Sequence, residues 1–198
     1  MQIDPELLAP RDRYRLLTHA FVPRPIAWMS TVSPAGVANL APFSFCGAVT
    51  SEPLMLMVSV GRRRGARKDT ADNLLATGEG VLHIPHSELV AQMVASSAEL
   101  APEVDEFEHV ELAKARSVRV RAPRVAAAAI AMEVLVERHF EVGDGPVDLF
   151  LLRAVLLHLA DEFLVDGVPQ PERLSAIGRL GAASYLNTHS TFEMQRPE

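Results

Sequence analysis

Cysteine is almost absent from this sequence, whose 198 residues contain only Cys46. A single cysteine excludes an internal disulfide framework and favours a reducing compartment. Positive charge is not in excess either, because 19 lysines and arginines face 25 aspartates and glutamates, giving a net charge of −6. This balance argues against a nucleic-acid binder that relies on overall positive charge.

Long hydrophobic runs are also missing. The two longest apolar stretches, 125–132 and 147–160, are ended or interrupted by charged residues, whereas a membrane span needs about 20 largely apolar residues. The N-terminus shows no basic stretch followed by an apolar run, so no signal peptide is expected. The sequence predicts a cytoplasmic protein, and its length suits one domain covering residues 1–198.

Several familiar catalytic and binding motifs are absent. His83 and His86 are three residues apart, but Pro85 breaks the helical spacing that a metal site would need. No nucleophile-elbow serine occurs, and no glycine-rich phosphate loop is visible. Cys46 has no base nearby in the sequence and is expected to be a small buried apolar residue.

Short β-type runs separated by turn signals dominate what is present. Strands are expected at 25–32, 37–45, 54–60 and 80–84, with long β-type runs at 125–142 and 147–161 joined by a hairpin at 143–146. Helices are expected near 12–18, from Asp69 or Thr70 (as N-cap) to about Ala76, and over 87–96, with an acidic loop at 100–111. This pattern favours an antiparallel barrel over a parallel doubly wound sheet.

The stretch from Arg24 to Thr70 carries the main candidate site. Ser30 and Thr31 end an apolar strand, so one is expected to face the core and the other the outside. Ser44 returns to the same end, Lys68 adds a point charge, and a helix beginning near residue 69 offers free N–H groups. The set predicts either a phosphate site or ordinary strand residues beside a solvated lysine.

Two neighbouring features leave alternatives open. Pro42 inside an apolar strand indicates an edge, bulge or break, whose free backbone groups either pair with a heterocycle or face no ligand. The basic run 62–68 either attracts an anionic dinucleotide such as NAD(P)H or is a solvated loop. The glycine-flanked segment 175–185 either places Arg179 and Tyr185 over a ligand edge or simply leads into a terminal helix.

Three segments together resemble the flavin reductase-like proteins. They are 24–44, Lys68-Asp69-Thr70-x-x-Asn73, and Gly178-Arg179-Leu180-Gly181 with Tyr185, in matching order across about residues 10–190. The resemblance implies a mainly β (α+β) fold, namely an FMN-binding split β-barrel that is antiparallel with a few peripheral helices. It also implies a homodimer that holds FMN non-covalently near the subunit interface.

The resemblance further implies which residues surround the cofactor. The implied FMN-binding residues are Ser30, Thr31, Val32, Asn39, Leu40, Ala41, Pro42, Ser44, Lys68, Asp69 and Thr70. The hydroxyls and the 68–70 segment would surround the phosphate and ribityl chain, and the backbone of 39–42 would border the isoalloxazine ring. Arg179 and Tyr185 would lie on the nicotinamide or substrate side. No metal and no catalytic side chain are expected, because the flavin carries the chemistry.

The function expected from this resemblance is an FMN-dependent oxidoreductase that takes hydride from NADH or NADPH, with a partner monooxygenase as a further expected partner. The alternatives are a flavin-binding electron carrier without NAD(P)H turnover, and a non-flavin binding protein on the same barrel. The chain departs from many relatives at Cys46-Gly47, where they carry a phenylalanine and an asparagine. This departure implies a wider site or a looser flavin.

Overall fold

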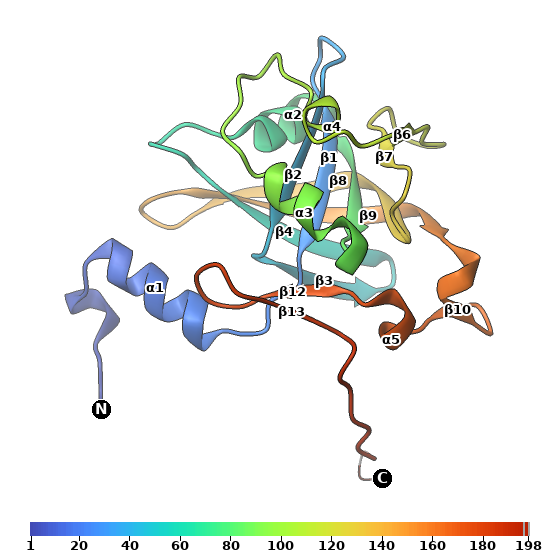
Figure 1. Ribbon diagram of the computed structural model, residues 1–198. Helices are drawn as coiled ribbons and strands as arrows, with labels where there is room; N and C mark the ends of the chain where they lie inside the picture. The colour runs from blue at the N-terminus through green and yellow to red at the C-terminus, as the bar shows by residue number, and fades with distance from the viewer. Residues whose placement is uncertain (196, 198) are drawn as a thin grey trace.

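A computed structural model describes residues 1–195 and 197 and shows a strongly curved antiparallel sheet with helices at its periphery (Figure 1). The seven strands of this sheet follow the order β2-β1-β5-β8-β9-β4-β3. They are β1 (Ala27–Val32), β2 (Ala38–Phe43), β3 (Cys46–Ser51), β4 (Leu54–Gly61), β5 (Glu79–Ile84), β8 (Ile130–Val142) and β9 (Val147–Leu159). The predicted mainly β, antiparallel architecture is confirmed.

Shorter elements surround the sheet. Three two-stranded ribbons pair β6 (Lys114–Ala115) with β7 (Arg124–Val125), β10 (Leu164–Val165) with β11 (Val168–Pro169), and β12 (Ile177–Arg179) with β13 (Tyr185–Asn187). The α-helices are α1 (Pro10–Ala20), α2 (Asp69–Thr77), α3 (Val90–Ala95), α4 (Glu106–His109) and α5 (Pro171–Leu174). Single 3-10 turns cover Pro5–Leu7, Ser87–Leu89 and Asp161–Phe163. Within the described residues, no helix combines the length and apolar character needed to cross a membrane.

The expected turns set the sheet topology. Gly143 adopts φ +84° in the tight connection between β8 and β9, which confirms the predicted hairpin. Gly78 ends α2 in the left-handed conformation, with φ +71°. However, β8 begins only at Ile130, and the alanine-rich segment 126–129 before it is not a strand, consistent with the poor β-propensity of alanine.

β1 is buried along its whole length because the two faces of the sheet are both covered. One core cluster, which includes Met29 and Phe150, packs with α2 on one face. A second, which includes Trp28 and Phe107, packs under α3 and α4 on the other. The expectation that either Ser30 or Thr31 faces outside is therefore wrong, since both are completely buried.

Three local predictions were also wrong. The acidic segment 100–111 contains α4, whose N-cap Asp105 accepts the N–H of Phe107. Neither Asp69 nor Thr70 caps α2; Lys68 holds the N-cap position and no side chain caps the helix. The strand after Phe43, β3, was not anticipated, and it places Cys46 half-buried against the core rather than inside it.

Candidate functional site

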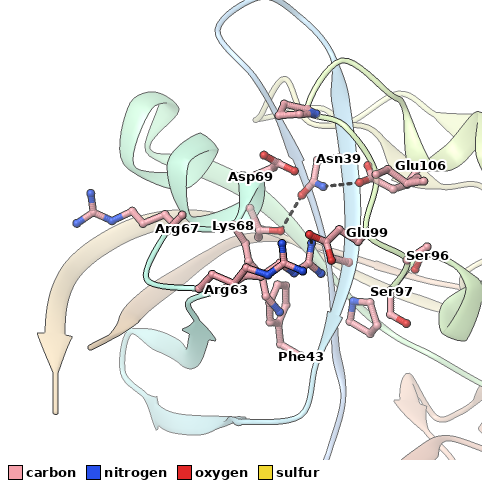
Figure 2. Close-up of a pocket in the computed structure, with 18 residues that line it drawn as sticks. Asn39, Phe43, Arg63, Arg67, Lys68, Asp69, Ser96, Ser97, Glu99 and Glu106 are labelled. Carbon is pink, nitrogen blue, oxygen red and sulfur yellow. Dashed lines mark hydrogen bonds and ion pairs between the residues drawn. The ribbon is translucent and has the colours of Figure 1, made fainter. Parts of the chain in front are cut away.

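A cavity of about 340 Å³ lies between the edge strand β2 and the start of α2 (Figure 2). Ala41, Pro42 and Phe43 of β2 form its apolar side. The loop 63–68 supplies its cationic side and the first turn of α2 adds Asp69 and Thr70, while the segments after α3 and at α4 close it. We call it the β2–α2 cavity. Pro42 lies on the outermost strand of the sheet, as its missing N–H favours.

Positive charge concentrates where α2 begins. Lys68 Nζ lies 5.5 Å from the centre of the Phe43 ring, within cation–π distance. Burial, with a smaller contribution from the charge of Arg63, lowers the pKa of Lys68 below its ordinary value of 10.5. No side chain caps α2, so its first N–H groups and the positive end of its dipole favour an anion in the cavity.

A buried polar network fixes the cavity wall. Asn39 Oδ1 accepts hydrogen bonds from Thr70 Oγ1 at 2.7 Å and Thr31 Oγ1 at 3.2 Å. Its amide nitrogen donates to Glu106 Oε1 at 3.0 Å (Figure 2). The other Glu106 oxygen accepts the Leu40 N–H at 3.1 Å. Burial raises the pKa of Glu106 although these hydrogen bonds oppose the shift. The network joins β2, α2 and α4, and it satisfies an N–H of the edge strand.

The basic run 62–68 is divided between two tasks. Arg62 Nε and Arg67 Nε each lie 3.0 Å from a carboxylate oxygen of the fully buried Asp148, which His139 also contacts at 2.9 Å. Burial alone would raise the pKa of Asp148, but hydrogen bonds from Arg62, Arg67 and His139 lower it to about 2. Figure 2 shows Arg67 pointing away from the other labelled side chains. Asp148 thus anchors the loop and leaves its remaining cations at the cavity.

Arg63 is one of those remaining cations. Its Nη1 lies 3.4 Å from Glu99 Oε1, but both side chains are substantially exposed. An exposed pair of this kind contributes little to stability, so an incoming anion can compete with Glu99 for Arg63.

A second hollow, of about 570 Å³, adjoins the cavity and is called here the α1 groove. Pro42 and Ser97 line both hollows, so the two are contiguous. The groove runs between α1 and the β12–β13 hairpin, whose loop lies beside the C-terminal end of α1 in Figure 1. The His19 ring occupies the space that a Cβ at Gly181 would need, which accounts for glycine at this position.

Arg24 holds these segments together. It is 4% exposed, and its guanidinium donates to the carbonyls of Thr18 at 2.6 Å, Phe21 at 3.1 Å and Leu180 at 3.0 Å. Its Nε donates to Ser44 Oγ at 3.4 Å, and its backbone pairs with that of Arg179. One buried arginine thereby ties α1, the turn after β2 and the C-terminal hairpin into a single wall.

The structure distributes the sequence-predicted site residues over three places. Those that line the β2–α2 cavity are Asn39, Ala41, Pro42, Lys68, Asp69 and Thr70. Those that line the α1 groove are Pro42, Ser44, Arg179 and Tyr185. The four that line neither hollow are Ser30, Thr31, Val32 and Leu40.

The hydroxyls of the buried pair are used within the protein. Ser30 donates to the carbonyl of Pro123 at 2.6 Å, and Thr31 bonds to Asn39 while accepting from Asn73 at 3.1 Å. Thr31 thus supports the cavity wall through Asn39, whereas Ser30 bonds to a residue that does not line the cavity.

Sequence reasoning missed two parts of the cavity. Ser96 and Ser97 follow α3, and Glu106 lies in α4 within a segment expected to be a loop. The Asp105 N-cap signal could have revealed α4. Nothing local indicated that Glu106 reaches Asn39, 67 residues away. No group of three or more histidine, cysteine, aspartate or glutamate side chains with metal-binding geometry occurs among the described residues.

Comparison with known proteins identifies the family. The sequence model of the flavin reductase like domain matches residues 19–167. The chain belongs to the flavin reductase-like family. The uncharacterized protein BH2278 of Halalkalibacterium halodurans is 37% identical to this chain. The match covers 100% of this chain and 97% of that protein.

Solved structures with the same fold are also similar to this chain. Nitrilotriacetate monooxygenase component B from Bacillus cereus is 35% identical with a TM-score of 0.95, and the match covers 98% of each chain. The 2-nitrobenzoate 2-nitroreductase of Pseudomonas fluorescens is 22% identical with a TM-score of 0.91, over 100% of this chain and 96% of that one. The second likeness concerns the fold alone. The predicted split β-barrel of the flavin reductase-like family is confirmed.

Proposed function

We propose that this protein binds FMN across the β2–α2 cavity and the α1 groove and catalyses hydride transfer from NADH or NADPH. The observation that carries the proposal is the uncapped start of α2, with Lys68 at its N-cap and Arg63 in the preceding loop, facing the apolar edge of β2. A phosphate requires converging donors, and a flat ring requires an apolar strip beside them. The β2–α2 cavity provides the donors and the apolar strip, and the α1 groove continues from it at Pro42.

The residues divide into anchoring and bordering roles. Lys68, Arg63 and the first N–H groups of α2 would hold the FMN phosphate. Asp69 also lines the cavity; burial, followed by the charge of Asp72, raises the pKa of its carboxyl above the ordinary value. The isoalloxazine ring would lie against residues 41–44 and extend into the α1 groove. Bound FMN supplies an electron-accepting ring for the hydride of a reduced nicotinamide.

The protein would contribute position and exclusion of water. Asn39, held by Thr70 and Glu106, keeps the strand edge in place beside the ligand. Arg179 stacks on the Tyr185 ring, with its guanidinium carbon 4.4 Å from the ring centre, and the pair would cover the reacting edge. No side-chain acid or base is assigned, because hydride transfer to a flavin needs none from the protein.

Flavin retention and reduction test the proposal directly. Purified protein is incubated with FMN, desalted and scanned for flavin absorbance, then mixed anaerobically with NADH or NADPH. We expect retained absorbance that either nicotinamide bleaches at a catalytic rate. Loss of all flavin on desalting would refute the site. Retained flavin that stays oxidised with both nicotinamides would instead identify an electron carrier.

A monooxygenase is the proposed acceptor of the electrons. The support is the close likeness to the Bacillus cereus component B, which is by name one component of a monooxygenase. A reductase of this kind would release reduced flavin to a separate oxygenase. Product formation by an added oxygenase component, with this protein as the sole source of reduced flavin, tests the assignment; no coupling with any oxygenase component of the same organism would refute it.

A homodimer is proposed from an exposed apolar surface on α1. Leu16 and Leu17 are 45% and 49% exposed, and with Ile3, Pro5, Leu8 and Arg13 they line a shallow hollow of about 390 Å³. Leaving such a surface in water is unfavourable, and a second copy of the chain would cover it. Light scattering should give twice the monomer mass of 21.6 kDa, and Leu17→Glu should shift it toward the monomer. A monomeric wild type would refute this assignment.

A further inference from the structure

We propose that Arg11 and Arg15 form an oxyanion-binding subsite at the outer end of the α1 groove. It would hold the negatively charged group of the substrate that meets the flavin. The inference rests on the proposed function for the role of that substrate, and it adds a site on α1 that the flavin itself does not require. The ligand chemistry is an organic phosphate or carboxylate attached to a planar ring.

The spacing of residues on α1 creates this surface. Arg11, Tyr14, Arg15 and Thr18 line the groove, and the intervals of three and four residues place them on one face of the helix. Arg13, Leu16 and Leu17 lie on the apolar surface described above instead. The helix therefore presents Tyr14 and two of its three arginines to the groove.

The charge of the groove is unusual for this protein. Its lining contains four arginines and His19 but no aspartate or glutamate, although the whole chain carries a net charge of −6. A concave surface of one sign raises the local concentration of ligands of the opposite sign. The lining also includes Tyr14, Tyr185, Met93 and Val94, which suit the flat apolar part of such a ligand.

Only two of the four arginines remain available to a ligand. The guanidinium of Arg24 already donates hydrogen bonds to three backbone carbonyls. Arg179 donates to the Tyr185 hydroxyl and to the carbonyl of Ala182. Arg11 and Arg15 have no ion pair and no side-chain hydrogen bond with any other described residue. Arginine binds phosphate and carboxylate through parallel N–H donors, so this pair fits an oxyanion.

Arg24 also fixes where the subsite lies. By bonding to the carbonyls of Thr18 and Phe21, it holds the C-terminal end of α1 against the groove. Pro42 and Ser97, which also line the groove, line the β2–α2 cavity as well. A ligand whose anion rests on Arg11 and Arg15 would therefore extend toward the flavin.

The test compares the double variant Arg11→Gln/Arg15→Gln with Arg13→Gln, which removes one charge from the same helix outside the groove. Titration calorimetry with NADP⁺, NAD⁺ and benzoate is carried out on each protein with and without FMN. All three substitutions are at exposed positions, so folding should be retained. Arg13 borders the proposed dimer surface, so light scattering must first show that Arg13→Gln has the same mass as the wild type. We expect the double variant to bind the relevant anion about tenfold or more weakly, with little change in Arg13→Gln.

The probes separate the two sources of the oxyanion. Weaker binding of both dinucleotides identifies a phosphate, and weaker binding of benzoate alone identifies the carboxylate of a small aromatic acceptor. Added salt should weaken wild-type binding but affect the double variant less. Equal binding of every probe to the double variant and to Arg13→Gln, or no binding of any probe to the wild type, overturns the subsite. Flavin retention is recorded separately, so failure of the FMN proposal remains distinguishable.

Discussion

Thr70 Oγ1 donates a hydrogen bond to Asn39 Oδ1 over 2.7 Å, joining the first turn of α2 to the edge strand β2. The two residues are 31 positions apart, and both are buried. Asn39 in turn holds Glu106 of α4. The side-chain amide of Asn39 thus connects the two sides of the cavity. One side would face a phosphate and the other would face a ring.

Replacing Thr70 tests this coupling. Thr70→Val keeps the side-chain shape but removes the donor, and we expect the free energy of unfolding to fall by about 1 kcal/mol. Thr70→Ser restores the hydroxyl and should recover most of the loss. Urea unfolding measures both variants. Equal stability of wild type and Thr70→Val would show that the bond contributes nothing to the fold.

Lys68→Ala tests the phosphate anchor. Loss of one charge-assisted hydrogen bond should weaken FMN binding by about 1.5–3 kcal/mol, or roughly ten- to a hundred-fold. Arg153→Ala is the control, because Arg153 is an exposed cation that pairs with Glu137 on the sheet and lines neither hollow. Flavin fluorescence quenching gives the affinity. An unchanged affinity in Lys68→Ala would place Lys68 outside the site.

The charge of Lys68 also makes flavin affinity depend on pH. Burial, together with the charge of Arg63, lowers the pKa of Lys68 in the folded protein. Its positive charge is therefore lost at a lower pH than that of an ordinary lysine. FMN affinity should decline as the pH rises through that lowered pKa, and the decline should be smaller in Lys68→Ala. Parallel pH profiles for the two proteins would contradict this assignment.

The fold was predictable where local sequence decides structure. Alternating apolar residues and turn glycines such as Gly78 and Gly143 act over a few positions, and the strands and turns they predict are present. The positions of the Ser30 and Thr31 hydroxyls were not predictable in this way. Periodicity assigns alternate residues to opposite faces of a strand, but only tertiary packing determines that both faces of β1 are covered.

The site was predictable in its main segments but not in its connections. Lys68 and the strip at Pro42 follow from the family motif, and both line the cavity. Asp148 anchors the cationic loop from 81 residues away from Arg67, and Glu106 reaches Asn39 from a segment without periodicity. Such long-range pairs depend on strand order and register, which no short motif encodes.

Asp148 should control stability in acid. Its folded pKa of about 2 lies below the ordinary value of 3.8, so the ionised form is favoured in the native state. The resulting stabilisation is fully present above about pH 4 and disappears as the pH falls toward 2. At about 1.4 kcal/mol for each pKa unit, it is of the order of 2 kcal/mol. Urea unfolding between pH 2 and pH 7 should show this loss in the wild type.

The Asp148→Asn variant is the direct comparison. It should lose about 3 kcal/mol or more at pH 7, because Arg62 and Arg67 keep their charges without a buried partner. Its further decline between pH 4 and pH 2 should be smaller. Glu141→Gln removes an exposed partner of the same two arginines and should change stability by less than about 1 kcal/mol. Equal effects of the two substitutions would show that burial of Asp148 does not matter.

Gly80 and Gly47 form a matched pair for testing how tightly the strands are packed. A Cβ at Gly80 would lie 3.0 Å from the Ser30 carbonyl oxygen and 3.3 Å from Leu74. Because a backbone atom cannot rotate away, Gly80→Ala should destabilise the protein by about 1–3 kcal/mol. At Gly47 the nearest atom is the end of the flexible Met57 side chain, at 3.7 Å, so Gly47→Ala should be neutral or up to about 1 kcal/mol stabilising. Thermal and urea unfolding of both variants measure the difference. The contrary result is that Gly47→Ala lowers the free energy of unfolding as much as Gly80→Ala. Another part of the protein would then lie closer to Gly47 than the contact with Met57 indicates, and glycine at this position would have a structural cause.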